Sequence, residues 1–199
     1  MFGESRPGMR KAITNLSRYI ATPMVSRHKV FVWEPVHVIP ENLIVVIARD
    51  DDYFLGVLHS KLHELWLRRK GTQLREAQSG TRYTPTTTFE TFPFPWAPGK
   101  EPKSDPRVKA IAKAANELVQ LRDNWLNPPD ISESELKKRT LTNLYNARPS
   151  LLEIAHRRLD EAVLDAYGWP HDLRDDEILA RLLELNLARA AKQENTGKK

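Results

Sequence analysis

A short polar segment carries side chains of the types that read the edges of DNA bases. Residues 74–82 (LREAQSGTR) include Arg75, Glu76, Gln78 and Arg82. Arg suits guanine, Gln suits adenine and Glu accepts from cytosine, so this segment offers three kinds of base-edge ligand. Loops of this composition are also often simply hydrated. The segment is therefore a candidate base-reading loop, with a hydrated loop as the alternative.

A second candidate site precedes the first strong strand pattern. Small residues and hydroxyls there are flanked by cations, and cations and hydroxyls on a turn are good ligands for phosphate, which position a duplex without reading it. The alternative is a solvated, charged edge. The candidate backbone-binding residues are Arg18, Thr22, Ser26, Arg27, His28 and Lys29.

The charge distribution favours an anionic partner for the first half. Residues 1–103 hold 15 Lys and Arg against 10 Asp and Glu, whereas residues 104–199 hold 16 of each sign. The whole net charge of +5 therefore lies in the first half. An anionic partner such as nucleic acid is expected to be attracted there.

Histidines and aspartates provide two weaker candidates for metal sites. His59 and His63 are spaced i, i+4, but the order is HxxxHE rather than HExxH, and no third ligand is suggested by spacing. Asp50–Asp52 could hold a hard cation, although acidic residues before a helix complement its dipole. We expect internally bonded or exposed histidines, a helix-start role for the aspartates and no metal site.

No catalytic motif is recognisable in the chain. None of the eight glycines forms a GxG turn of the type that brings a backbone against a methyl-donor cofactor, and there is no cysteine. The sequence Asn127-Pro128-Pro129-Asp130 superficially resembles the NPPY loop of amino-methyltransferases. It lacks the terminal aromatic that would stack on a flipped base, so a helix-ending turn is expected. We expect no catalysis by this chain alone.

Residues 82–96 (RYTPTTTFETFPFPW), here called the strap, separate the two halves of the sequence. Pro85, Pro93 and Pro95 fix φ and remove donors, which predicts a rigid, non-helical segment. Alternation places Phe92, Phe94 and Trp96 on one side. We expect these rings to be buried and to close a core, since exposed rings would instead favour stacking on RNA bases.

The periodicities predict an α+β fold with two parts. The first, residues 10–98, is a basic mixture of strands and helices, and the second, residues 104–191, is helical. A polar tail over residues 192–199 is expected to be disordered. The element predictions are a helical turn within Lys11–Ile20, strands at Lys29–Glu34 and Leu43–Ala48, one helix from about Asp52 to Gly71, a linker at Ala97–Ser104, a helix starting at Asp105-Pro106, capping boxes at Ser132/Glu135 and Ser150/Glu153, a stop at Gly168 and a last helix to about Ala191.

Four long strings resemble the type IIL (MmeI-like) restriction–modification enzymes. They are Arg18–Trp33 (RYIATPMVSRHKVFVW), Ala48–Trp66 (ARDDDYFLGVLHSKLHELW), the strap and Leu141–Pro170 (LTNLYNARPSLLEIAHRRLDEAVLDAYGWP). Members of this family are DNA adenine methyltransferases fused to a nuclease. The resemblance implies a target recognition domain followed by a helical C-terminal domain, with double-stranded DNA as partner. It places base-reading residues just ahead of the FETFPFP string, which favours the functional interpretation of residues 74–82.

The resemblance also sets expectations for what lies outside the chain. The methyltransferase and nuclease portions would lie upstream or act in trans, and S-adenosylmethionine would bind there. The chain would be a gene fragment, a split specificity subunit or an excised segment. No apolar run is long enough to cross a membrane and no signal sequence opens the chain. The absence of cysteine excludes disulfides, which fits the cytoplasm. The rivals are a protein–protein module that uses the helical half as its contact surface, and an RNA-binding module.

Overall fold

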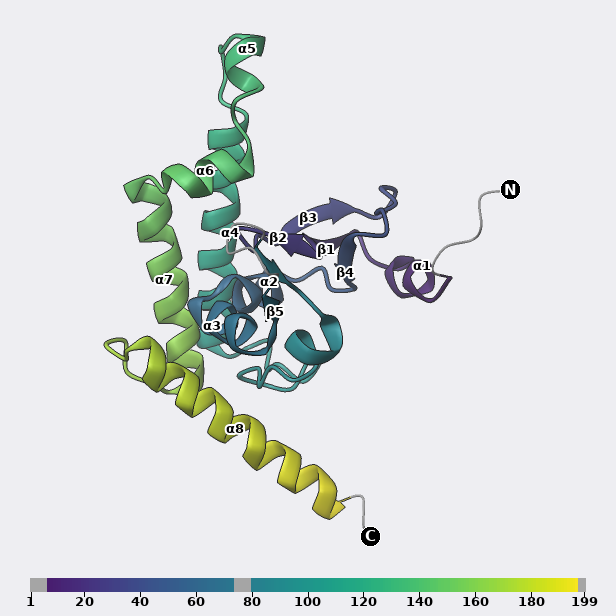
Figure 1. Ribbon diagram of the computed structural model, residues 1–199, viewed down its shortest axis with the longest axis vertical. Helices are drawn as coiled ribbons and strands as arrows, with labels where there is room; N and C mark the ends of the chain where they lie inside the picture. The colour runs from purple at the N-terminus through teal and green to yellow at the C-terminus, as the bar shows by residue number, and fades with distance from the viewer. Residues whose placement is uncertain (1–6, 74–79, 197–199) are drawn as a thin grey trace.

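The computed structural model describes residues 7–73 and 80–196 (Figure 1). Short strands and helices come first and longer helices follow, so the fold is α+β as predicted. The elements are α1 (Pro7–Ile13), β1 (Arg18–Pro23), β2 (Val25–Ser26), β3 (Val32–Pro35), β4 (Ile44–Ile47), α2 (Asp52–His59), α3 (Lys61–Lys70), β5 (Thr72–Gln73), β6 (Thr81–Arg82), η2 (Pro85–Phe89), α4 (Pro106–Leu126), α5 (Glu133–Leu136), α6 (Leu141–Ala147), α7 (Ser150–Tyr167) and α8 (Asp175–Thr196).

The first sheet has β1 at its centre, paired antiparallel with β3 and β4. Both faces of β1 are covered: Ile20 belongs to the main core, while Tyr19 and Ala21 pack with Ile13 of α1. The prediction of a helical turn within Lys11–Ile20 is therefore wrong for its last residues: α1 ends at Ile13, and the chain from Arg18 forms a strand that is buried on both faces. The predicted strands at Lys29–Glu34 and Leu43–Ala48 correspond to β3 and β4, within a few residues.

The second sheet, in the order β2-β6-β5, is small: β2 follows β1 directly in the chain, whereas β5 and β6 follow α3. Gly80 precedes its middle strand with φ +83, and a Cβ there would overlap the Ser26 carbonyl of β2. Only glycine combines this backbone conformation with such a close approach. The two backbones therefore meet at a fixed point.

Helices α2 and α3 replace the single helix that the apolar stripe predicted. Ser60 is the C-cap of α2 and the N-cap of α3, and its hydroxyl donates to Val57 O at 2.7 Å. The aspartates have the predicted helix-start role, since the Asp51 carboxylate accepts from Phe54 N at 2.9 Å. The predicted stop at Gly71 is confirmed as the C-cap of α3.

The strap contains a helical turn that the prolines were expected to forbid. Pro85 opens the π-helical turn η2 and occupies its first position, where a missing N–H costs nothing. Glu90 N donates to Pro85 O at 2.9 Å to close it. The prediction of a wholly non-helical strap is therefore wrong over Pro85–Phe89.

The second half follows its predicted caps with two exceptions. Asp105 caps α4 with Pro106 next to it, and Gly168 ends α7 in the left-handed conformation with φ 70. Ser132 caps α5, but Ser150 lies inside α7 because Pro149 takes the cap position. Helix α8 continues beyond Ala191 to Thr196, so the predicted tail begins as helix.

The two halves share one hydrophobic core. Helix α4 packs against α2 from the first half and runs alongside α7 from the second (Figure 1). Gly56 of α2 allows this approach, since a Cβ there would lie 2.7 Å from Ile111 Cγ2. Residues on both sides of the boundary expected between residues 98 and 104 thus belong to the same hydrophobic core. Within the described ranges, no helix has the length and apolarity needed to span a membrane.

Candidate nucleic-acid interface

Arg18 is half-buried, and its guanidinium is paired with groups of the protein itself. Its guanidinium donates to Asp50 O at 3.1 and 3.2 Å and pairs with the Asp52 carboxylate at 2.9 Å. It also stacks over Trp33, 3.7 Å from the ring centroid. Arg18 therefore ties the start of β1 to the N-terminus of α2, and its charge is shared with a carboxylate rather than held for a phosphate.

The two predicted hydroxyl ligands point inward. Thr22 is 1% exposed, and its hydroxyl donates to Val30 O at 2.9 Å. The Ser26 Oγ is buried and has no hydrogen-bond partner in the described part of the chain. In this conformation neither hydroxyl is available to a phosphate, because β1 directs the Thr22 side chain and β2 directs the Ser26 side chain toward the protein interior.

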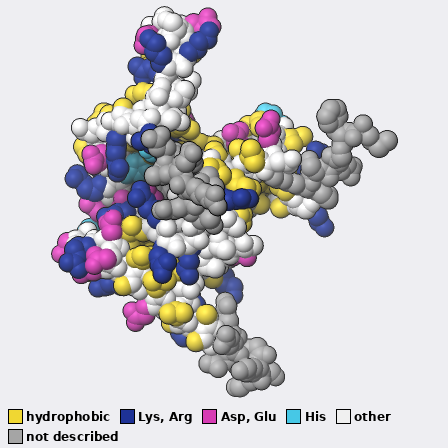
Figure 2. All heavy atoms as spheres, viewed as in Figure 1, with side chains coloured by type: hydrophobic (Ala, Val, Ile, Leu, Met, Phe, Trp, Pro, Cys, Tyr) yellow, Lys and Arg dark blue, Asp and Glu magenta, His cyan; other side chains and the backbone are white. Residues whose placement is uncertain are grey.

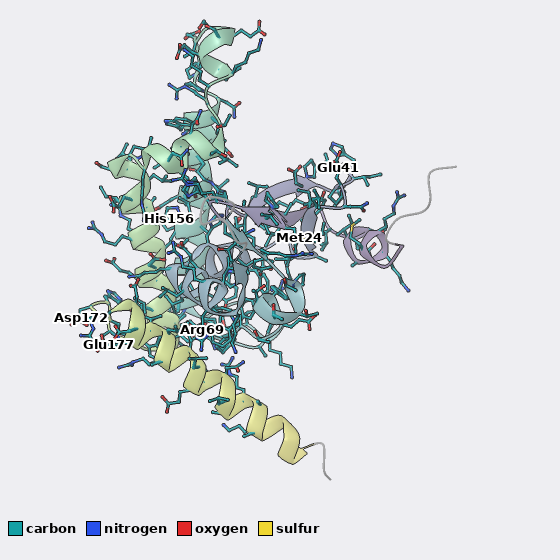
Figure 3. All side chains as sticks on the ribbon, viewed as in Figure 1. Met24, Glu41, Arg69, His156, Asp172 and Glu177 are labelled. Atoms are coloured by element: carbon teal, nitrogen blue, oxygen red, sulfur yellow. The ribbon has the colours of Figure 1, made fainter. Side chains whose placement is uncertain are left out.

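His28 and Lys29 hold the turn in place. His28 Nε2 lies 2.8 Å from Asn146 Oδ1 of α6, so the turn contacts the helical half. Lys29 Nζ donates to Pro23 O at 2.6 Å and to Met24 O at 3.4 Å, and Figure 3 labels Met24 in this region. Burial lowers the pKa of Lys29 to about 8. Its ammonium is thus directed at backbone carbonyls.

Arg27 differs from the other five predicted phosphate ligands. Its side chain is exposed, and within residues 7–73 and 80–196 no hydrogen bond or ion pair engages it. It follows Ser26 of β2, whose Cα pairs with that of Thr81. Arg27 is therefore the candidate in this set whose guanidinium is open to an external anion.

One of the predicted base readers lies in the described structure. Arg82 is exposed on β6, the middle strand of the second sheet, where its Cα pairs with those of Val25 and Thr72. Residues Arg75, Glu76 and Gln78 lie outside the described residues. They follow β5 and precede β6 in the chain, so the described strands flank the candidate base-reading segment on both sides.

The aromatic rings of the strap close the core. Phe92 and Phe94 are 4% and 3% exposed, and Phe94 stacks on Phe54 with ring centroids 4.9 Å apart. Trp96 is half-buried, with Arg107 over its ring at 5.1 Å. Burial of the two phenylalanines favours the strap over a base-stacking platform, which removes the main support for RNA binding.

Side chains of the helical half donate hydrogen bonds to backbone carbonyls of the strap. Tyr167 Oη donates to Pro93 O at 2.9 Å. Asn186 Nδ2 donates to Thr91 O at 2.7 Å and Arg189 Nη1 to Phe94 O at 2.6 Å. These donors satisfy carbonyls that have no strand partner, so the strap is held without joining a sheet.

The rival protein–protein interpretation finds little apolar surface on the helical half. Its large exposed hydrophobic residues in the described structure are Leu136, Leu151 and Leu187, which lie singly on three different helices. Single exposed apolar residues are normal on a protein surface, whereas a docking patch is contiguous. Among the described residues, no contiguous apolar face therefore singles out the helical half.

The two histidines of the HxxxHE pattern are buried and hydrogen-bonded. His63 Nδ1 lies 2.9 Å from Leu58 O, and Arg122 Nη1 lies 2.9 Å from His59 Nε2. Burial lowers the pKa of His63 to about 4 and that of His59 well below its ordinary value. Among the described residues, no group of three His, Cys, Asp or Glu side chains could hold a metal ion.

Arg122 is a functional candidate that residue-type reasoning missed. It is 2% exposed, and its Nη1 also donates to Phe31 O at 3.2 Å. No carboxylate of the described chain pairs with it. Its position continues the α4 stripe of Ile111, Ala115 and Leu118 at helical spacing, which is the signal that could have found a buried arginine.

Comparisons with known proteins match this chain to MmeI and to a DNA methyltransferase. The family described as "MmeI, target recognition domain" matches residues 14–96. DNA methyltransferase A of Bacillus subtilis (strain 168) is 32% identical over 146 residues, which cover 72% of this chain and 14% of the relative. The solved structure of the type IIL restriction–modification enzyme MmeI in complex with DNA is 26% identical, with a TM-score of 0.68.

The solved MmeI structure matches 88% of this chain, so the similarity extends into the helices after the strap. The chain in turn spans 22% of that MmeI chain and 14% of the curated methyltransferase. The matched family range ends at Trp96, the last residue of the strap. Residues 14–96 therefore form a region that matches the MmeI target recognition domain family, and the similarity to MmeI continues beyond that region.

Proposed function

We propose that this chain docks on duplex DNA and selects the sequence at which a catalytic portion of a type IIL enzyme methylates adenine. The observation that supports the proposal is the match, over 88% of the chain, to MmeI solved in complex with DNA. The catalytic portion would be supplied upstream or in trans. Such a role would place the chain in the cytoplasm with genomic DNA.

The second sheet gives this proposal a geometric basis. Arg27 follows β2 and Arg82 lies on the neighbouring strand β6, and both side chains are exposed. Neighbouring strands are about 4.8 Å apart, so the two cations are presented from adjacent backbones. In the proposed role Arg27 contacts phosphate, which positions the duplex, and Arg82 contacts a base edge next to it.

The segment between the described strands carries the proposed sequence choice. Arg75, Glu76 and Gln78 supply the remaining base-edge ligands in this proposal. Each bidentate base contact discriminates against a wrong base by about 1–3 kcal/mol. Exchange of these residues is therefore expected to change the preferred base pairs rather than the overall affinity for DNA.

The residues that the structure describes do not fit S-adenosylmethionine. All pairings in the two described sheets are antiparallel, and none of the eight glycines forms a GxG turn. The nucleotide-like part of such a cofactor needs backbone brought close by glycine after a parallel strand. In the proposed arrangement the cofactor and the methyl transfer belong to the catalytic portion.

The direct test measures binding of fluorescent duplexes by anisotropy across a salt series. We expect affinity to fall steeply with salt, with a log–log slope of about −0.9 for each phosphate contact. Arg27→Ala should reduce that slope by about 0.9 on every duplex. Arg158→Ala on α7, an exposed arginine away from the second sheet, is the matched control and should leave the slope unchanged.

Sequence choice needs a second readout. With the chain joined to a catalytic portion, sequencing of methylated sites should show a changed motif when residues 74–79 are exchanged. Absence of salt-dependent duplex binding would refute the docking role. An unchanged motif after the exchange would move base reading to another segment.

A further inference from the structure

A cleft of about 820 Å³ lies between the first half and the helical half of the protein. The Arg27–Lys29 turn and α3 form one wall, and the end of α6, α7 and the start of α8 form the other. Figure 2 shows this hollow with a histidine inside it and Lys and Arg side chains on its rim. Figure 3 places His156 on the side of α7 that faces the centre of the molecule.

Polar contacts fix the two walls together at the end near Arg27. His28 bonds Asn146, and its ring lies 5.9 Å from that of Tyr145. Tyr145 Oη in turn lies 3.0 Å from His156 Nε2 on α7. This chain of contacts sets the position of the Arg27 turn relative to α6 and α7.

Arg148 lies on the opposite wall of the same cleft. It is exposed and forms the C-cap of α6 in the left-handed conformation, with φ 42, and its N–H donates to Leu144 O at 2.8 Å. Pro149 follows it and starts the turn into α7. The backbone at Arg148 is therefore held from both sides, while its side chain is free to reach a ligand.

The carboxylates around the cleft leave these two arginines unpaired. Neither Arg27 nor Arg148 forms an ion pair within residues 7–73 and 80–196. Three acidic groups of the cleft pair with cations that also line it: Glu64 with Arg68, Glu161 with Arg157 and Asp175 with Lys61. Asp160 accepts from Lys61 N, and Glu153 is exposed on the first turn of α7. Six Lys and Arg side chains and five Asp and Glu side chains line the cleft, so among the described residues the positive charge that remains unpaired there is that of Arg27 and Arg148.

Arg122 adds a further positive charge close to the cleft, behind the residues that line it. It is buried, without a carboxylate partner in the described structure, and its Nη1 contacts His59, which lines the cleft. A buried guanidinium without a counterion is costly and favours an anion nearby. Its charge also helps to lower the pKa of His156 to about 4, after the larger effect of burial, so that ring is neutral.

We propose that Arg148 and Arg27 together hold one stretch of the DNA phosphate backbone, so that the helical half forms part of the DNA-docking surface. This inference rests on the proposed function. Two guanidiniums on facing walls suit successive phosphates, since each presents a planar fork of donors to phosphate oxygens. The helices after the strap then help to orient the duplex for the base-reading strands.

The test compares Arg148→Asn, Arg148→Lys and Arg27→Ala with the control Arg158→Ala in the salt-dependent anisotropy assay. Asn tolerates the left-handed conformation, so Arg148→Asn removes the charge without straining the cap. We expect it to reduce the log–log slope by about 0.9, equally on all duplexes, so that a fourfold rise in salt weakens binding about 3.5-fold less than for the unchanged protein. Arg148→Lys should keep the slope, and each variant's Tm checks folding.

The outcomes separate this inference from the function on which it rests. If the unchanged protein binds duplex and Arg27→Ala lowers the slope, but Arg148→Asn does not, the helical half has no part in docking and the inference is overturned. A slope change in Arg158→Ala as large as that in Arg148→Asn would also overturn it, since it would show general rather than local electrostatics. If no duplex binds, the proposed function itself fails.

Discussion

Arginine has three different roles in this protein, set by what surrounds each guanidinium. Arg18 joins two elements through Asp52, and Arg122 is buried against His59 and a backbone carbonyl. Arg27 is exposed and unpaired in the described structure. At the residue scale, the local partners decide which charge remains available to a ligand.

The hydroxyl of Thr22 gives a prediction at this scale. Thr22→Val should lower the free energy of unfolding by about 1–3 kcal/mol, because it leaves the buried Val30 carbonyl without its donor. Thr22→Ser keeps the hydroxyl and serves as the control. Urea unfolding measures the difference, and the salt dependence of DNA binding should not change. A reduced salt slope in Thr22→Val would return this residue to the phosphate-binding set.

The sequence of the basic turn predicts which residues are cations, but it does not predict which groups those cations contact in the fold. The sequence indicates that Arg18 and Arg27 are cations near a strand, but Asp52 lies 34 positions after Arg18 and its approach depends on the packing of α2 on β1. Arg148 was not singled out because its importance depends on α6 meeting the turn through His28. Such long-range partners cannot be predicted from local pattern.

At the element scale, the second sheet depends on a contact between two backbones. Gly80→Ala should destabilise it strongly, because the new Cβ overlaps the Ser26 carbonyl in addition to straining a backbone at φ +83. Gly99→Ala is a matched control: its φ is +82, but the nearest atom is Arg49 Nη1 at 4.0 Å. The free energy of unfolding of Gly99→Ala should fall by about 1 kcal/mol, from backbone strain alone.

Thermal unfolding and duplex binding of the two glycine variants provide the measurement. Gly80→Ala should lower Tm more than Gly99→Ala and should also weaken DNA binding, since Arg27 and Arg82 flank the disturbed contact. Equal losses of stability in both variants would mean that the strands shift at little cost to admit the methyl group.

Helix ends were the most predictable elements, because caps are local chemistry. Asp105, Ser132 and Gly168 were identified from one to four neighbouring residues, and all three end or start a helix as predicted. The break at Ser60 was missed because the apolar stripe continues through it. The turn η2 was missed because proline was judged as a helix breaker without regard to its position at the first residue.

At the scale of the whole molecule, the shared core predicts cooperative unfolding. Ile111 of α4 packs against Gly56, and the strap carbonyls depend on Tyr167, Asn186 and Arg189. The chain should therefore unfold in a single transition by calorimetry. A fragment of residues 1–103 should lack a cooperative transition, because the apolar surface covered by α4 and α7 becomes exposed. Two separate transitions would instead indicate independent domains.

Buried histidines make stability depend on pH. The folded-state pKa is about 4 for His63 and His156 and is also lowered for His59, so the unfolded chain binds more protons between pH 6.5 and about 4. The free energy of unfolding should fall as pH falls through this window, by on the order of 1–2 kcal/mol per ring at pH 5. Urea titrations at several pH values measure this.

Asp160 changes the free energy of unfolding with pH in the direction opposite to the histidines, so it provides a control. Burial raises its folded-state pKa to about 7, so its contribution is fully present below the unfolded value and is lost as pH rises toward 7. Asp160→Asn can still accept from Lys61 N and removes this term, so acid destabilisation should become steeper. A stability that does not change between pH 7 and pH 5 in both proteins would contradict the assigned protonation states.

The contact between Gly80 and the Ser26 carbonyl has a consequence for how such proteins diversify. The frame on either side of residues 74–79 is fixed by main-chain pairing of β5, β6 and β2, and that pairing does not depend on which side chains the intervening residues carry. A change at Gly80 disturbs this pairing directly and is therefore expected to be selected against. Under the proposed function, exchange of the six codons for residues 74–79 is expected to change the target sequence while the strands that flank them are inherited unchanged.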